Sequence, residues 1–143
     1  NVEKLLLKES IENLDNMNGY SGLHKGAEQI KLNFISFLIN AKKEGKKVAA
    51  YGAAAKGNTL LNFCGIKNDL IQFVVDAAPS KQGKFLPGSH IPIVKEEVVK
   101  KIKPDYIVIF PWNIKDEIIK QLYYTREWGC KFVISVPELT ILQ

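Results

Sequence analysis

Cysteine and long apolar runs are scarce in this sequence, and each scarcity excludes a class of protein. The two cysteines, Cys64 and Cys130, stand alone without CxxC or histidine spacing, which argues against a disulfide framework or a zinc site in this chain. The longest apolar stretches, 70–75 and 106–112, fall far short of the roughly 20 residues that a membrane-spanning helix needs. We therefore expect a soluble, cytoplasmic protein that has no membrane partner and uses both cysteines for packing.

The excess of positive charge is confined to one part of the chain. Residues 1–45 contain six lysines and six acidic residues, whereas residues 46–143 contain fourteen Lys or Arg against nine acidic residues and so carry the whole net charge of +5. The lysines are scattered singly, without an arginine-rich face or interleaved aromatics, so no nucleic-acid partner is expected. An anionic small molecule fits this distribution better.

The length and composition predict a single globular domain. With 143 residues, of which 46% are hydrophobic and 24% charged, the chain can bury a sizeable core. It begins with Asn rather than Met. We therefore expect it to be a piece of a longer protein.

Two helices are predicted before the main domain. Apolar residues recur at helical spacing over 2–17, and the run Asn-Met-Asn-Gly then ends the pattern. A second apolar stripe predicts a longer helix over about 23–43, which Gly45 stops. We expect residues 1–45 to be a helical lead-in that packs on the sheet of a domain formed by 46–143.

After Gly45 the pattern changes to strands that alternate with helices. We expect strands at 47–51, 70–75, 106–110 and 131–136, an edge strand at 139–142, and helices at about 58–64, 94–102 and 113–128. This alternation predicts an α/β fold, a Rossmann-like open parallel sheet flanked by helices, with the two extra helices at the N-terminus. The connection 77–90 is too long for a simple loop, which is typical of functional segments.

The carboxyl ends of the strands are where ligands bind in such sheets. Here three segments reach that edge: the turn at Gly52, Asp76 with the loop 77–90, and the residues 111–113. We expect them to converge on one crevice. The strand–turn–helix junction at Gly52 would offer free backbone N–H groups and the positive end of a helix dipole, so an anion is the expected guest.

Three interpretations of the turn 52–59 compete. It has the spacing of a Walker A loop, but Asn58 replaces the lysine that reaches the terminal phosphates. It also resembles a GxGxxG dinucleotide fingerprint with alanine in place of the second glycine, and Asp76 follows the next strand, where a ribose-binding carboxylate would be. A degenerate dinucleotide-binding domain thus stays open. So does a tight junction in which the small residues have no ligand.

Taken whole, a longer set of motifs is more specific than any of these patterns. The stretch YGAAAKGNTLLN at 51–62 is followed by DxxPxKxG at 76–83, PGxxIPI at 87–93 and WN at 112–113. In this order they resemble the C-terminal domain of the sugar C-methyltransferase family, over most of residues 20–137.

The resemblance implies a division of labour. In that family a zinc-binding domain and an S-adenosylmethionine domain precede a Rossmann-like C-terminal domain, and the enzyme methylates a carbon of a nucleotide-linked keto-sugar. This chain has no cysteine cluster and no second glycine-rich turn, and His24 and His90 fall in no motif that the family uses for proton abstraction. We therefore expect no catalytic residue, metal or cofactor here. S-adenosylmethionine and structural zinc would belong to upstream domains, and this chain would bind the nucleotide-diphosphate sugar without methylating it.

The resemblance also points to substrate contacts at the crevice. We expect them from the turn and from the loops beside it, at Gly52, Ala53, Ala54, Ala55, Lys56, Gly57, Asn58, Thr59, Asp76, Lys81, Trp112 and Asn113, with Lys84 beside Lys81. Seven of them have an alternative role: Lys56, Lys81 and Lys84 in solvent, Asn58 and Asn113 as helix caps, Asp76 as a cap of its loop, and Trp112 in packing. A scaffold or interaction module without a ligand is the alternative for the whole chain.

Overall fold

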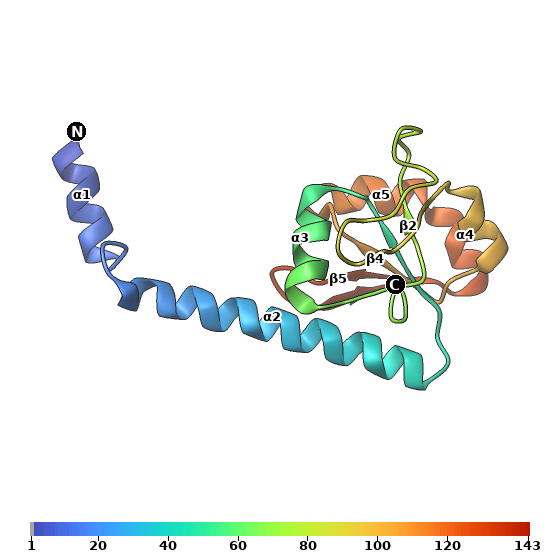
Figure 1. The fold of residues 1–143 in the computed structure, drawn as a ribbon, viewed down its shortest axis with the longest axis horizontal. Helices are drawn as coiled ribbons and strands as arrows, with labels where there is room; N and C mark the ends of the chain where they lie inside the picture. Colours follow the sequence, from blue (N-terminus) through green and yellow to red (C-terminus); the bar gives the residue numbers. More distant parts are fainter. Residues whose placement is uncertain (1) are drawn as a thin grey trace.

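A six-stranded sheet forms the centre of the structure, a computed structural model that describes residues 2–143 (Figure 1). Its order is β3-β2-β1-β4-β5-β6. The strands are β1 (Val48–Tyr51), β2 (Val74–Val75), β3 (Ile93–Val94), β4 (Tyr106–Ile109), β5 (Lys131–Ile134) and β6 (Thr140–Leu142). All pair in parallel except β6, which runs antiparallel to β5. The expected Rossmann-like α/β fold and the edge strand near 139–142 are thus confirmed.

Helices cover both faces of the sheet because its strands are apolar on both sides. One cluster joins Val48 and Ala50 of β1 to α2 (Met17–Lys43) and α3 (Ala55–Cys64). The other joins Ala49 and Tyr51 to α4 (Glu97–Ile102), α5 (Lys115–Gln121) and the 3₁₀ helix η2 (Tyr123–Trp128). A further 3₁₀ turn, η1 (Trp112–Ile114), follows β4.

The N-terminal helices divide differently from the prediction. The first, α1 (Val2–Ile11), is shorter than the predicted 2–17, and α2 begins at Met17 rather than near residue 23. Asn16 caps α2, since its side chain accepts a hydrogen bond from the Asn18 N–H at 3.0 Å. The run interpreted as a stop signal is therefore a helix start. Residue 1 of the expected lead-in lies outside the described part of the chain.

Only the second half of α2 packs on the domain. Its buried residues are Phe34, Leu38 and Ala41, whereas α1 buries no residue and lies beyond the sheet, at the far end of α2 (Figure 1). The prediction that the whole lead-in packs on the sheet is therefore wrong for its first part.

Several element boundaries also differ from the prediction. The second strand is limited to β2 because the N–H groups of Leu70 and Ile71 turn back to the Lys67 carbonyl, each at 3.2 Å. The predicted helix 113–128 is split into η1, α5 and η2, and the predicted helix 94–102 and strand 131–136 are each shorter. Asn113 is not a cap: it lies inside η1, and α5 begins after Ile114.

Both cysteines are buried, Cys64 at 5% and Cys130 at 3% exposure. Burial raises the pKa of the Cys64 thiol, and it raises the pKa of Cys130 to about 12. Residues 2–143 hold no group of three or more His, Cys, Asp or Glu side chains that could bind a metal ion. Nor does any helix in this range combine the length and apolar character needed to cross a bilayer.

The native thiols are expected to resist alkylation. At pH 8 both side chains stay protonated and covered, so N-ethylmaleimide should react with them at least about 100-fold more slowly than in urea. Mass spectrometry of the labelled chain over time measures both rates. Rapid labelling of either cysteine in the folded chain would contradict this burial.

Candidate functional site

The turn between β1 and α3 lies where the sheet order reverses. From β1 the chain continues to β2 on one side, and β4 lies on the other side. In open α/β sheets, ligands bind at this point, outside the carboxyl ends of the strands. The structure thus places the predicted turn at the carboxyl edge of the sheet, between β1 and β4.

Two glycines let the turn close onto the end of β4. Gly52 has φ +95°, and a Cβ there would lie 2.6 Å from Pro111 Cδ. A Cβ at Gly57 would lie 2.6 Å from the ring of Phe110. Both positions require glycine, because side-chain carbons essentially never approach so closely. The first turn of α3 is therefore held directly against the residues that follow β4.

The backbone amides of the turn divide into two groups. Ala53 N–H donates to Asp76 Oδ2 at 2.9 Å, and Ala54 N–H donates to the Gly52 carbonyl at 2.9 Å, so these two are used internally. Within residues 2–143, the amides of 55–57 donate to no protein group. They form the first turn of α3, where the helix dipole favours an anion. Of the backbone amides in this turn, those of 55–57 are therefore the ones left free for an anion.

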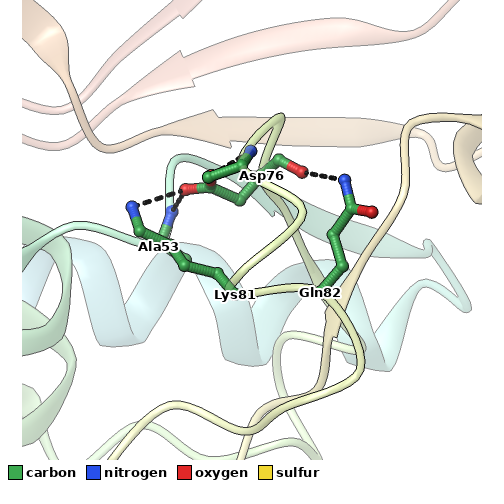
Figure 2. A network of polar contacts seen from close by, with 5 residues as sticks. Ala53, Asp76, Lys81 and Gln82 are labelled. Carbon is green, nitrogen blue, oxygen red and sulfur yellow. Dashed lines mark hydrogen bonds and ion pairs between the residues drawn. The ribbon is translucent and has the colours of Figure 1, made fainter.

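Asp76 forms a polar network that ties two loops together (Figure 2). Its Oδ2 accepts hydrogen bonds from Ala53 N–H at 2.9 Å and from Lys81 Nζ at 3.2 Å, and its Oδ1 accepts one from Ala78 N–H at 2.8 Å. Its backbone carbonyl accepts a fourth, from Gln82 Nε2 at 2.9 Å. Of the two roles expected for Asp76, loop capping is the one whose bonds are present. The Lys81 ammonium forms an ion pair with this carboxylate instead of standing free in solvent.

An apolar cavity of about 440 Å³ opens beside the first turn of α3. Lys56 Nζ lies 5.4 Å from the centre of the Trp112 ring, and this pair forms part of the wall. The lining residues are Ala55, Lys56, Thr59, Leu60, Phe63 and Trp112. The Lys56 side chain and the rings of Phe63 and Trp112 therefore lie around one opening beside the first turn of α3, which suits a ligand with a planar ring and a negative charge.

Three further residues predicted to contact the substrate do not line this cavity. Asn113 is exposed and does not line this cavity, and Lys84 is exposed in the loop 77–90. Asn58 is not the helix cap, because that position is Ala54. Instead its Oδ1 is buried without a hydrogen-bond partner in the described chain.

Sequence reasoning missed two residues at this edge. Phe63 lines the cavity, and its spacing of four and seven residues from Thr59 and Lys56 along α3 could have revealed it. Ser135 directly follows β5, is 1% exposed, and has a hydroxyl without a partner in residues 2–143. By strand alternation it lies on the α3 face of the sheet, as Val133 does. No sequence signal marks it, because the serine follows an ordinary apolar strand.

Comparisons with known proteins agree with the fold and the motifs. Residues 1–137 match the family described as "C-methyltransferase C-terminal domain". The C-methyltransferase NovU of Streptomyces niveus is 33% identical over 141 residues, which cover 99% of this chain and 34% of the relative. The chain thus spans about a third of the length of this curated relative. It belongs to the C-methyltransferase C-terminal domain family.

Proposed function

We propose that this chain is the substrate-binding domain of an S-adenosylmethionine-dependent C-methyltransferase that acts on a nucleotide-diphosphate-linked keto-sugar. On its own it binds the substrate and does not transfer the methyl group. The methyl donor and a structural zinc ion belong to upstream domains of the same protein. The observation that carries this proposal is the group of free amides at 55–57 beside Lys56 and Trp112.

The chemistry of C-methylation explains why a separate substrate-binding domain is useful. Methylating a carbon next to a carbonyl requires removal of its proton and then alignment of the enolate with the methyl donor. Contacts to a remote diphosphate supply binding energy for that alignment. The diphosphate would lie on the amides of 55–57 and the Lys56 ammonium, with the Thr59 hydroxyl beside it. The Trp112 ring would stack on the base or the sugar.

Thermal unfolding in the presence of thymidine diphosphate tests the proposal. A ligand that binds only the native state must raise the melting temperature, so millimolar thymidine diphosphate in low salt should produce a clear rise. No rise with any nucleoside diphosphate would favour a ligand-free scaffold. A rise with nicotinamide dinucleotides alone would favour the degenerate dinucleotide domain.

Lys56→Ala is expected to weaken thymidine diphosphate binding about tenfold, because a charge-assisted hydrogen bond to phosphate is lost. Isothermal titration calorimetry measures the change. Lys120→Ala is the matched control, since it removes the same charge from an exposed site on α5, on the other face of the sheet. Equal weakening by both variants would mean that only the net charge matters. No weakening by Lys56→Ala would remove this residue from the site.

A further inference from the structure

One apolar stripe runs along α2, but the domain covers only its second half. The stripe repeats every three or four residues, at Tyr20, Leu23, Ala27, Ile30, Phe34, Leu38 and Ala41. From Phe34 onward its residues are buried, whereas Leu23 is 71% exposed. The same pattern thus continues beyond the domain, where Tyr20 and Leu23 are exposed.

The helix before it is entirely uncovered. None of the ten residues of α1 is buried, and its exposed apolar side chains are Val2, Leu5, Leu6, Leu7 and Ile11. An isolated helix shorter than roughly 12–15 residues is marginal in water, so α1 needs a packing partner. We call residues 2–29, which project from the domain in Figure 1, the docking arm.

The corner between the two helices is closely packed. Tyr20 Oη donates to the Leu14 carbonyl at 3.0 Å, and a Cβ at Gly19 would lie 1.9 Å from the Asn13 carbonyl oxygen. Specific contacts therefore hold the turn between α1 and α2 within the docking arm.

The charge of the docking arm indicates a protein partner. It contains three lysines against five acidic residues, so it does not attract the phosphates of nucleic acid or of anionic lipid. Exposed apolar side chains in such number are typical of a surface that packs against another protein domain.

The comparison with NovU indicates which domain the docking arm packs against. The matched segment of NovU amounts to 34% of that protein, and the match covers 99% of this chain, so the docking arm is within it. In the relative the corresponding helices therefore share a polypeptide with about two-thirds of the protein outside the match. A tethered partner is present at high effective concentration, so even a modest apolar patch suffices for stable packing.

From these observations we infer that the docking arm packs against the methyltransferase region of the same polypeptide. The inference rests on the proposed function, because it takes such a region to precede this domain. It adds a second role for the chain: α1 and the first half of α2 set the position of the binding domain relative to the region that holds the methyl donor.

Cysteine accessibility tests this contact. Leu23→Cys and Lys25→Cys place thiols on opposite faces of α2, about 200° apart, and both native cysteines are buried. N-ethylmaleimide labelling at each position is followed by peptide mass spectrometry, in the 143-residue chain and in the complete gene product. We expect residue 23 to label at least about tenfold more slowly in the complete product. Residue 25, on the polar face, should label at similar rates in both.

Two labelling results would overturn the inference. One is equal labelling of residue 23 in both proteins. The other is labelling of the 143-residue chain that slows as its concentration rises, which would identify a second copy as the partner. A complete gene product without a methyltransferase region would overturn it too. Thymidine diphosphate binding is measured on the same samples. If the complete gene product binds thymidine diphosphate but residue 23 labels as fast as in the 143-residue chain, only the inference is wrong. If residue 23 is protected but thymidine diphosphate does not bind, only the proposed function is wrong.

Discussion

Gly52→Ala is expected to lower the free energy of unfolding by about 3 kcal/mol. Gly52 has φ +95°, a conformation that alanine adopts only with strain, at a cost of about 1–2 kcal/mol. The new Cβ would also lie 2.6 Å from Pro111 Cδ and 2.7 Å from its Cγ. Relieving this overlap requires the turn to move away from the end of β4, which costs about 1–3 kcal/mol more. Urea unfolding followed by circular dichroism measures the sum.

Gly65→Ala separates these two costs. Gly65 ends α3 with φ +70°, but a Cβ there would meet nothing within 4 Å. This variant should therefore lose only about 1 kcal/mol, from the backbone conformation alone. Equal losses for the two variants would show that the contact between the turn and Pro111 is not tight. The Gly52 variant should also bind thymidine diphosphate less well, because the turn that carries the free amides has shifted.

Asp76→Ala is expected to cost about 3 kcal/mol of folding free energy. Asp76 is 9% exposed, and its carboxylate accepts two backbone N–H bonds, from Ala53 and Ala78. Removing it leaves both donors without their acceptor. Chemical denaturation measures the loss. Relative to the unmutated chain, amide hydrogen exchange should become faster in the loop 77–90 and change less in β4.

Two variants check the origin of that loss. Lys81→Met should cost less than about 1 kcal/mol, because its side chain is 43% exposed and its ion pair with Asp76 is screened by solvent. Asp69→Ala removes an exposed carboxylate for which no side-chain partner is found within residues 2–143, so its effect should stay within about 0.5 kcal/mol. If Asp69→Ala were as costly as Asp76→Ala, general electrostatics would explain the loss rather than the loop network.

The fold could be predicted because its signals are local. The runs that become β1, β4 and β5 are short and apolar, and glycine or proline separates them from the intervening helices. The errors have local causes too. Asn16 was interpreted as part of a stop, although asparagine is also a preferred helix start. The split of 113–128 was not predictable, because 3₁₀ turns carry no hydrophobic period of their own.

The candidate site could be predicted only in outline. The turn at Gly52 and the end of β4 were expected to meet, because parallel strands end at the same edge. The bond from Ala53 to Asp76 was not, since it joins residues 23 positions apart and uses a backbone donor. Which amides stay free depends on such bonds. The sequence therefore predicts a site at the turn but not which of its groups are available to a ligand.

The most direct test of the central claim is an NMR titration of the ¹⁵N-labelled chain with thymidine diphosphate. We expect the largest amide shifts at Ala55, Lys56 and Gly57, with a shift of the Trp112 indole N–H and little change at the Trp128 indole, which donates to the Pro104 carbonyl. Saturating shifts at 55–57 would place the anion on the first turn of α3. Shifts confined to other surfaces, or none at millimolar ligand, would contradict the proposal that this turn grips the substrate.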